Sequence, residues 1–266
     1  MKKTAPIGVI DSGVGGLTVL KCLHKNMPHE DFIYLGDTAR TPYGSRSGEE
    51  VKRFTGEMLD WLETQRVKLV VIACNTITVT GVDDLAKGRP FSIVGMSKGE
   101  HLVLSDSKNK KIGVLATAFT ISTSAHKKAI LAVDAAADVH PMACSKFVPL
   151  IEGEQFGSAA LHDAICEYTQ PLVQDGVDTI ILSCTHFPFV ADEIKAVVGS
   201  GVTVIDPAEE TAANAAAALK EQDLARTEGQ GTVKICCTAD VERVRRLAAR
   251  MLTDDGCRFE EIKLAE

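Results

Sequence analysis

Residues 67–76, VKLVVIACNT, and residues 177–186, VDTIILSCTH, decide the fold that is predicted for this chain. In each stretch an apolar run ends on a cysteine that is followed by polar residues. A continuous apolar run predicts a strand that is buried on both faces, as in a parallel sheet covered by helices. The similarity of the two stretches suggests that one unit occurs twice.

A second pair of similar stretches supports this duplication. IGVIDSGVGG begins at residue 7 and IGVLATAFTIS at residue 112, and both pairs are offset by about 105 to 110 residues. Chance similarity between strands rich in Val and Ile is the alternative. We predict two pseudosymmetric, doubly wound α/β domains with mainly parallel sheets, the first formed by residues 1–97 and 206–266 and the second by residues 98–205.

Strands and helices alternate along the chain. The expected strands are Ile7–Ile10, Phe32–Leu35, Val67–Ala73, Ser92–Val94, Lys111–Leu115, Asp138–Pro141, Thr179–Leu182, Thr203–Ile205 and Thr232–Cys236. Apolar residues at helical spacing predict helices over 49–65 and 240–252. In DPAEETA, Asp206 is expected as an N-cap, Pro207 at the first helical position, and Glu209 as the partner in a capping box.

Composition restricts the class of protein. A net charge of −7 and a pI near 5.6 argue against nucleic acid or an anionic membrane as the main partner, although a local pocket can still bind an anion. We find no secretory signal and no apolar run of about 18 residues that could span a membrane. Eight cysteines without regular spacing fit a reducing compartment. We therefore expect a soluble cytoplasmic protein.

Two loops follow the first two predicted strands, at the edge where doubly wound sheets bind ligands. In DSGVGGLTV, residues 11–19, the glycines allow close backbone approach, while Asp11 and Ser12 supply polar groups. The spacing is not that of a dinucleotide site, so a polar substrate is favoured. In YLGDTARTPYG, residues 34–44, Asp37 fits a loop cap as well as a functional role.

Cys74 and Cys184 carry most of the functional argument. Each ends a predicted central strand and precedes a Thr-containing turn, a setting that favours a reactive thiol. For one such cysteine alone, inert burial would be equally acceptable. A zinc site is disfavoured because the ligands lack a suitable spacing, and a cysteine hydrolase would leave the second thiol unexplained. We interpret the other six cysteines as structural.

Two similar thiols on two similar units suit racemisation. A racemase removes a proton from one face of a carbon and returns one to the opposite face, and a single base cannot reach both faces. Two bases of one type can do so, one as the thiolate and the other as the thiol. A dry site with anion-binding groups must then stabilise the carbanion-like intermediate.

The ordered motifs IDSGVGG, YLGDTARTPYG, ACNT and CTHFP resemble those of the glutamate racemases of bacterial cell-wall synthesis. The resemblance continues through PLIEGEQF and IDPAEETA and covers most of the chain. It implies an isomerase that interconverts L- and D-glutamate without PLP, metal or other cofactor, with its active site in the cleft between two α/β domains. It also implies a role in peptidoglycan synthesis and cell shape, and a homodimer.

By this resemblance, Cys74 handles the proton of the D-isomer and Cys184 that of the L-isomer. Asp11, Glu152 and His186 match the polar residues of the family that adjust the protonation of the thiols or of the substrate amino group. Substrate-binding positions fall on Asp11, Ser12, Tyr43, Gly44, Asn75, Thr76, Thr117, Thr120 and Thr185.

Four departures from the family pattern are visible. Ala116 replaces a usual glycine, His126 stands where a tyrosine is common, Ser183 replaces a glycine, and Ser97-Lys98 replaces Glu-Pro. Two alternatives remain open: a racemase for aspartate or another acidic amino acid, and a two-lobed amino-acid-binding or sensor protein. The second would need no proton carriers.

Overall fold

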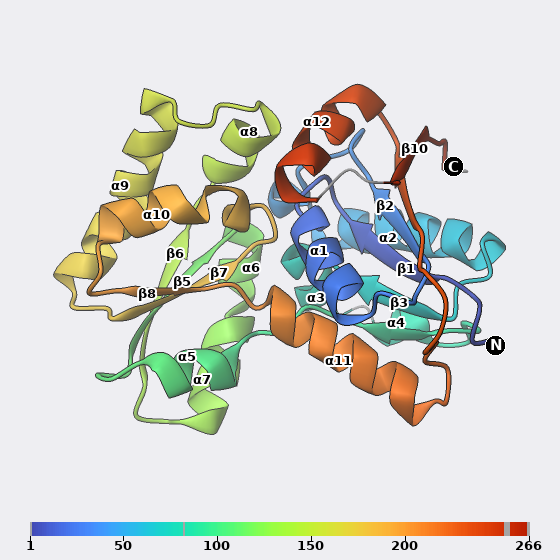
Figure 1. Ribbon diagram of the computed structural model, residues 1–266. Coiled ribbons are helices and arrows are strands. Elements are labelled where there is room, and N and C mark those ends of the chain that lie inside the picture. Colours follow the sequence, from blue (N-terminus) through green and yellow to red (C-terminus); the bar gives the residue numbers. More distant parts are fainter. Residues whose placement is uncertain (1, 82, 253–255, 265–266) are drawn as a thin grey trace. The chain divides into compact units, whose positions relative to one another are not determined.

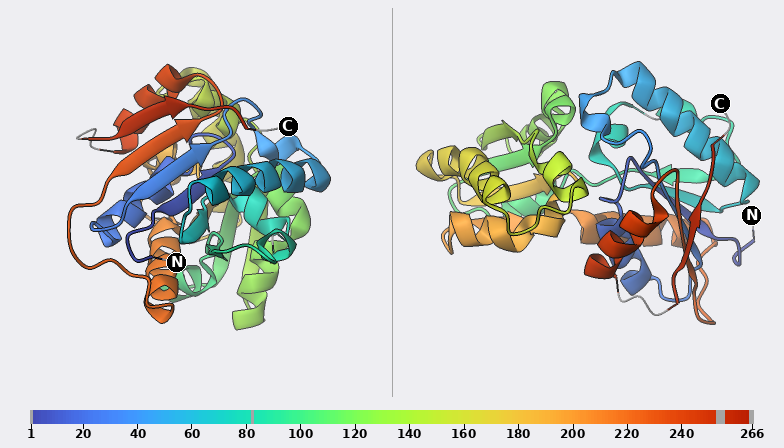
Figure 2. Two further views of the ribbon diagram at one scale, coloured as in Figure 1. Left: turned by 90° about the vertical axis from the view of Figure 1, so that its right-hand side faces the viewer. Right: turned by 90° about the horizontal axis from the view of Figure 1, so that it is seen from above.

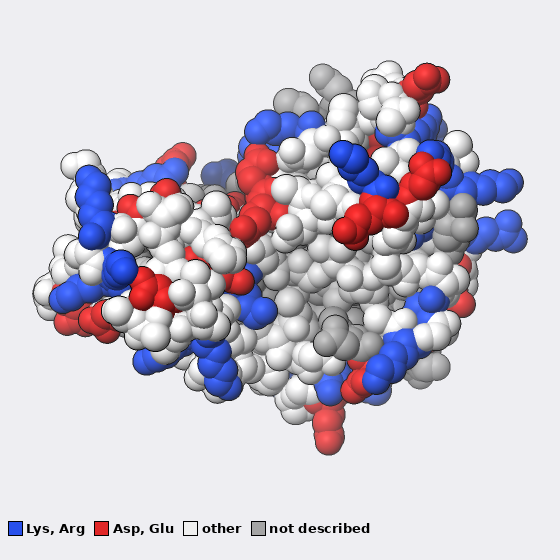
Figure 3. Space-filling view, turned by 90° about the horizontal axis from the view of Figure 1, so that it is seen from below, with Lys and Arg blue, Asp and Glu red and all other residues white. Residues whose placement is uncertain are grey.

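The computed structural model describes residues 2–81, 83–252 and 256–264 (Figure 1). They form two compact units. Unit 1 consists of residues 1–96 and 208–266, and unit 2 consists of residues 97–207. None of the helices in the described part of the chain is both long and apolar enough to cross a membrane. On the face drawn in Figure 3, basic and acidic side chains lie among one another on the surface of each unit.

Unit 1 is built on a six-stranded sheet with the order β10-β9-β2-β1-β3-β4, in which every neighbouring pair is parallel. Its elements are β1 (Ile7–Asp11), α1 (Leu17–Asn26), β2 (Phe32–Gly36), the 3-10 helix η1 (Tyr43–Ser45), α2 (Gly48–Thr64), β3 (Leu69–Ile72), α3 (Asn75–Val79), α4 (Asp83–Ala86), β4 (Ser92–Val94), α11 (Ala208–Glu221), β9 (Val233–Cys237), α12 (Val241–Met251) and β10 (Arg258–Glu261). In Figure 2, α2 lies on one side of this sheet, and α1, α11 and α12 lie on the other.

Unit 2 has a four-stranded parallel sheet with the order β6-β5-β7-β8. Its elements are α5 (Glu100–Asp106), β5 (Lys111–Ala116), α6 (Ala118–Thr123), α7 (Ala125–Val133), β6 (Asp138–Ala143), α8 (Phe147–Glu152), α9 (Ala159–Gln174), β7 (Thr179–Ser183), the 3-10 helix η2 (Phe187–Val190), α10 (Ala191–Val198) and β8 (Thr203–Ile205). Helices α9 and α10 pack against each other, as do α5 and α7. The two helix pairs cover opposite faces of the sheet (Figure 1).

The two sheets repeat one arrangement. The order β2-β1-β3-β4 within unit 1 corresponds strand for strand to β6-β5-β7-β8 in unit 2. Cys74 follows β3, and Cys184 follows β7, so the two thiols occupy equivalent positions. The predicted two-unit α/β fold with parallel sheets is confirmed, and the nine predicted strands are present with ends that differ by up to two residues.

Two details differ from the sequence-based expectation. Strand β10 was not predicted, because its sequence RFEE is short and mostly charged and pairs only at the sheet edge. Helix α11 begins at Ala208, one residue after the expected first helical position, and the capping box at Asp206 stays a prediction. The Glu209 carboxylate accepts hydrogen bonds from Lys25 Nζ at 2.9 Å and Asn26 Nδ2 at 2.8 Å. Glu209 therefore ties α11 to the end of α1.

Helix α2 shows how sequence and packing agree. Ser47 caps it, since the Ser47 hydroxyl accepts from the Glu50 amide while the Glu50 carboxylate accepts from the Ser47 amide. Its apolar residues at helical spacing, including Phe54 and Met58, are buried in a cluster with Val70 and Ile72 of β3. This packing fixes the side of the sheet on which the Cys74 side chain lies, because Cys74 belongs to the same cluster.

A buried ion pair lies at the start of β3, at the opposite end of the sheet from Cys74. Lys68 is fully buried and its ammonium group pairs with Glu30 while donating to the carbonyl oxygens of Lys3 and Leu224 at 2.6 and 2.9 Å. Glu30 also accepts a hydrogen bond from the Arg226 amide at 2.7 Å. The pair joins segments that are far apart in sequence, including the connection from α11 to β9.

We expect Lys68→Met to lower the free energy of unfolding of unit 1 by about 3 kcal/mol, because it leaves the Glu30 carboxylate buried without its cation. The matched control Lys25→Met removes the exposed pair with Glu209 and should leave the free energy of unfolding close to that of the unaltered protein. The measurement is urea unfolding followed by the fluorescence of Trp61, the single tryptophan, which packs on the core of unit 1. An equal loss of the free energy of unfolding in both variants would contradict the stabilising role of the buried Lys68–Glu30 pair.

Candidate active site

In unit 1 the loops after β1 and β3 bring polar side chains together beside Cys74. Because the two strands are parallel neighbours, their carboxyl ends meet at one edge of the sheet. The Cys74 thiol is 4 % exposed and donates to the Ser12 hydroxyl with an Sγ–Oγ distance of 3.7 Å. Asp11 is fully buried, and its carboxylate accepts from the Gly13 amide at 3.0 Å. The sequence-based grouping of Asp11, Ser12 and Cys74 is therefore seen in the structure.

Glycine 16 is required for this close approach. A Cβ atom at Gly16 would lie 2.8 Å from the Asp11 Cβ and 2.9 Å from the Ala73 Cβ, both shorter than real contacts of this kind. The DSGVGG turn can therefore bring Asp11 next to the end of β3 only with a residue that lacks a side chain at position 16.

Asn75 carries an unused hydrogen-bond donor. The side chain is 4 % exposed, and its Nδ2 is buried without a hydrogen-bond partner among the described residues. Leaving a buried amide donor unpaired costs about 1–3 kcal/mol. A ligand oxygen at this position would remove that cost, which agrees with the substrate-binding position that the family resemblance implies for Asn75. The following Thr76 is buried as well.

The loop after β2 differs in detail from the expectation for Tyr43. The Tyr43 side chain is 1 % exposed, and its hydroxyl donates to the Asp37 carboxylate. Asp37 is fully buried and also accepts from Arg40 Nε at 2.6 Å and Thr238 Oγ1 at 2.9 Å. Burial, followed by the charge of Asp37, raises the pKa of Tyr43. Asp37 thus holds the loop, and a ligand contact from Tyr43 or Gly44 would have to use the backbone.

In unit 2 the second thiol belongs to a line of three buried groups. Cys184 Sγ lies 4.0 Å from His186 Nδ1, and His186 Nε2 lies 2.8 Å from Glu152 Oε1. Their exposed fractions are 6, 2 and 8 %. Burial by itself lowers the pKa of His186, but the contacts with Cys184 and Glu152 outweigh it and raise the pKa well above its usual value. We therefore expect His186 to be an imidazolium at neutral pH.

The remaining predicted residues of unit 2 lie near the carboxyl ends of its strands. Thr117 caps α6, since its hydroxyl accepts from the Thr120 amide and donates to the Thr120 hydroxyl at 3.0 Å. Thr120 and Thr185 are buried, with 1 and 4 % exposure. These residues follow β5 and β7, which are paired neighbours, so they share a sheet edge with Cys184.

Three of the four departures from the family pattern, Ala116, His126 and Ser183, fall on buried positions, whereas Ser97 and Lys98 are partly exposed. His126 is 3 % exposed, and burial, with a smaller effect of Lys98, lowers its pKa to about 4. It is therefore neutral at neutral pH, unlike His186. His126 Nε2 and Ser183 Oγ are both buried without hydrogen-bond partners among the described residues.

The sequence analysis interpreted Cys144 as structural, but its place in the sheet is close to the candidate site. It follows β6, and its amide donates to the Ala116 carbonyl, which places it at the same sheet edge as Cys184 but two strands away. That separation is about 10 Å, too far for a disulfide. Burial, with a smaller effect of Cys184, raises the pKa of Cys144 well above its usual value, so it stays a neutral thiol. Only the strand order could have revealed its position.

Cys236 and Cys237 are not reactive thiols. Burial raises the pKa of both Cys236 and Cys237 to about 11. Within the described part of the chain, no group of three or more His, Cys, Asp or Glu side chains is arranged to hold a metal ion.

Comparisons with known proteins agree in pointing to one family. The family model described as Asp/Glu/Hydantoin racemase matches residues 7–215. The chain is 40 % identical over 250 residues to the glutamate racemase of Lysinibacillus sphaericus, covering 93 % of this chain and 94 % of that protein. It is similar in structure to the glutamate racemase isoform RacE1 from Bacillus anthracis, with a TM-score of 0.91, 32 % identity and 98 % of each chain covered. The glutamate racemase from Francisella tularensis, solved in complex with D-glutamate, matches with a TM-score of 0.87, 29 % identity and the same coverage.

The charge on His186 can be tested by an NMR titration of its ring protons. We expect a midpoint above pH 6.5 in the unaltered protein and a lower midpoint in Glu152→Gln, which removes the acceptor at Nε2. Because the pKa is raised in the folded state, the stability that this charge contributes is present below about pH 6.5 and is lost as pH rises through the folded pKa. Glu167→Gln, an acid on α9, is the control and should not move the midpoint. An unchanged midpoint in Glu152→Gln would refute the pairing.

Proposed function

Because the chain belongs to the Asp/Glu/Hydantoin racemase family, we propose that it is a glutamate racemase that interconverts L- and D-glutamate. The observation that carries the proposal is the equivalent placement of Cys74 and Cys184, each after the third strand of a repeated four-strand arrangement. Relatives over nearly the whole chain are glutamate racemases, one of them solved with D-glutamate.

The proposed reaction is a proton exchange at Cα by two thiols. The thiolate of one cysteine takes the α-proton, and the thiol of the other donates a proton to the opposite face of the planar intermediate. In the L-to-D direction Cys184 is the base and Cys74 the acid, and the reverse reaction exchanges these roles. Each step moves one proton and one electron pair, so the reaction requires no redox partner.

The surroundings of the two thiols differ. Cys74 Sγ lies 3.7 Å from the Ser12 hydroxyl, which is a neutral group. Cys184 lies beside His186, which the raised pKa makes positive, and a positive neighbour suits a sulfur that takes a proton from the substrate. This difference supports abstraction by Cys184 and donation by Cys74, the assignment that the family resemblance gives for L-glutamate.

The unused donor of Asn75 supports the binding of a carboxylate. A substrate carboxylate oxygen would accept from Asn75 Nδ2, and the backbone at Tyr43 and Gly44 can supply amide donors to the same ligand. Thr76, Thr117, Thr120 and Thr185 add hydroxyl groups at the sheet edges. Glu152 fixes the orientation of the His186 ring, and Asp11 fixes the turn beside Cys74.

The wider role is part of the proposal. Supply of D-glutamate for peptidoglycan, work in the cytoplasm, a homodimeric state and independence from PLP and metals all follow from the family resemblance. An aspartate racemase would use the same two thiols, so the distinction depends on the substrate side chain. A binding protein would not need the charged His186 beside one thiol.

The two-thiol mechanism can be tested in deuterated water. With L-glutamate as substrate, D-glutamate should form with deuterium at Cα, because the donating thiol exchanges with the solvent. Cys74→Ala and Cys184→Ala should each reduce racemisation by about 10²–10⁴-fold, since each removes one proton carrier. The measurement combines chiral chromatography with mass spectrometry.

Cys166→Ala is the matched control, because Cys166 is a partly exposed thiol on α9 of unit 2. It should keep the activity of the unaltered protein. Full racemisation by either single variant at position 74 or 184 would exclude the two-base assignment.

Substrate choice is a separate prediction. We expect kcat/KM for L-glutamate to exceed that for L-aspartate by at least about 10²-fold, because a shorter side chain leaves hydrogen-bonding groups of the site unpaired. Initial rates measured by chiral chromatography for both amino acids decide this. Faster turnover of aspartate would identify the enzyme as an aspartate racemase. The proposed two-thiol mechanism would still apply.

A further inference from the structure

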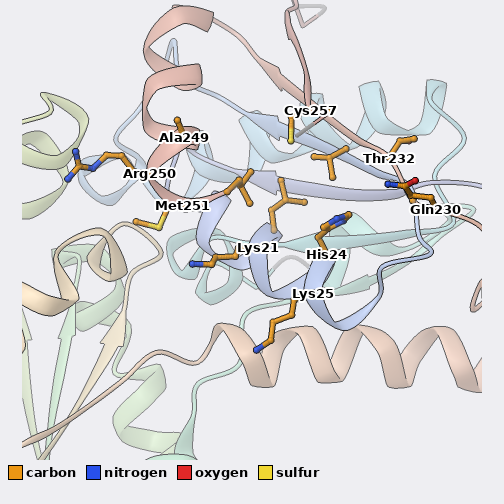
Figure 4. Close-up of a pocket in the computed structure, with 14 residues that line it drawn as sticks. Lys21, His24, Lys25, Gln230, Thr232, Ala249, Arg250, Met251 and Cys257 are labelled. Atoms are coloured by element: carbon orange, nitrogen blue, oxygen red, sulfur yellow. The ribbon is translucent and has the colours of Figure 1, made fainter. Parts of the chain in front are cut away.

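Unit 1 contains a cavity of about 730 Å³ between α1, the segment 230–233 and the end of α12 (Figure 4). Its lining includes Leu252 and Gly256, which adjoin residues outside the described part of the chain. It also includes Thr232, whose hydroxyl donates to the Asp31 carboxylate at 2.7 Å. We assign this cavity no ligand. The contacts that carry an inference lie in unit 2, in which every residue is described.

Helix α8 is too short to set its own position. It has six residues, Phe147–Glu152, and one of them is Pro149, which donates no backbone hydrogen bond. Isolated helices of this length are unstable in water, because too few hydrogen bonds offset the cost of ordering the chain. The position of α8, and with it the position of Glu152 at its end, therefore depends on what its side chains contact.

One side of α8 is buried. Its four buried residues are Phe147, Val148, Ile151 and Glu152. Phe147 and Ile151 are four residues apart, as are Val148 and Glu152, so the four side chains lie on one face of the helix. That face carries an aromatic ring at its first residue and the Glu152 carboxylate at its last.

Phe147 packs on the residue that follows His186. Its ring meets the ring of Phe187 edge to face, with centroids 5.0 Å apart and an interplanar angle of 87°. Both side chains are fully buried. Phe187 begins η2, and its amide donates to the Cys184 carbonyl at 3.0 Å, so it belongs to the turn that contains the thiol and the imidazole. Edge-to-face packing is a preferred geometry of aromatic pairs, so this contact fixes the orientation of α8 on the turn.

Helix α8 is thus attached to this turn at both of its ends. Phe147 contacts Phe187 at the start, and Glu152 Oε1 lies 2.8 Å from His186 Nε2 at the end. The helix spans about 7.5 Å between its first and last residues. A rotation of α8 by about 10° about its first residue would therefore move the Glu152 end by more than about 1 Å, which is enough to break the hydrogen bond.

Tyr168 of α9 gives Phe147 a second aromatic contact. The two ring centroids lie 5.2 Å apart at an interplanar angle of 80°. The Tyr168 hydroxyl also accepts from the Lys146 amide at 3.3 Å, which is a long hydrogen bond. Tyr168 is 7 % exposed, so the rings of Phe147, Phe187 and Tyr168 form one buried cluster.

We propose that Phe147 is a positioning residue for the proton transfer at Cys184, because its packing on Phe187 and Tyr168 places Glu152 against His186. The groups that raise the pKa of His186 are Cys184 and Glu152, whereas burial by itself lowers it. A displaced Glu152 would therefore leave the imidazolium less stable. The catalytic part of the proposal rests on the racemase function proposed above, and the placement of His186 does not.

Two variants weaken the aromatic cluster, and both are followed by NMR titration of the His186 ring protons and by racemisation kinetics. Phe147→Leu should lower the His186 midpoint by at least about 0.5 pH unit, because the Glu152 carboxylate is then poorly placed. It should lower kcat for L-glutamate by at least about 5-fold and leave KM within about 2-fold, since no substrate contact is removed. Tyr168→Leu should change the midpoint and kcat in the same direction, whereas Tyr168→Phe, which keeps the ring, should retain both.

Leu172→Val is the matched control, because Leu172 is a buried residue of α9 that lies against the sheet at Gly113. It should keep the midpoint and the kinetics of the unaltered protein, and urea unfolding confirms that each variant is folded. If Phe147→Leu does not fold, the two Tyr168 variants decide. An unchanged His186 midpoint in Phe147→Leu, an equal lowering in Leu172→Val, or equal midpoints in Tyr168→Leu and Tyr168→Phe would overturn the proposal.

Failure of the proposed function gives a different result. If the unaltered protein does not turn over glutamate but Phe147→Leu lowers the His186 midpoint, the racemase function is wrong and the placement of His186 by Phe147 stands. If Phe147→Leu racemises glutamate as fast as the unaltered protein, the racemase function stands and the positioning role of Phe147 is wrong.

Discussion

Parallel pairing of the strands is the constraint on which the candidate site depends. All neighbouring strands run in one direction, so the residues that follow β1, β2 and β3 must meet at a single edge of the sheet. The Asp37 amide donates to the Asp11 carbonyl, and the Ala73 amide donates to the Ile10 carbonyl, which continues the pairing up to Cys74. The chemistry of the loops is thus positioned by backbone hydrogen bonds before any side chain takes part.

Within that common frame the two units surround their thiols differently. Near Cys74 lie the neutral Ser12 hydroxyl and the Asp11 carboxylate, which accepts a hydrogen bond from the Gly13 amide. Around Cys184 a buried carboxylate, Glu152, holds a positive imidazolium. A duplication by itself would give the two cysteines the same surroundings. A reversible proton exchange, however, needs one cysteine as the thiol while the other is the thiolate. In the proposed mechanism, the positive His186 beside Cys184 and the neutral Ser12 beside Cys74 distinguish the two thiols.

Sequence patterns predicted what depends on local periodicity and failed where tertiary contacts decide. Runs such as LVVI at 69–72 identify buried strands, whereas β10 is held only by pairing with β9. Asp37 was ambiguous because a loop cap and a functional carboxylate have the same sequence signature, and only its bonds to Tyr43, Arg40 and Thr238 show the capping role. The proximity of Cys144 to the site follows from strand order, which no single stretch encodes.

The departures from the family pattern can be weighed by the same geometry. Side chains alternate along a strand, so Ser183 shares the side of Ile181, which packs with Val103 and Ile130 of the α5 and α7 layer. The Cys184 side chain then points to the other side, and a hydroxyl at 183 leaves the thiol and His186 undisturbed. His126 is neutral because it is buried, so it adds no second imidazolium to unit 2. Both replacements therefore alter packing in unit 2 without changing the charges on which the proposed proton transfer depends.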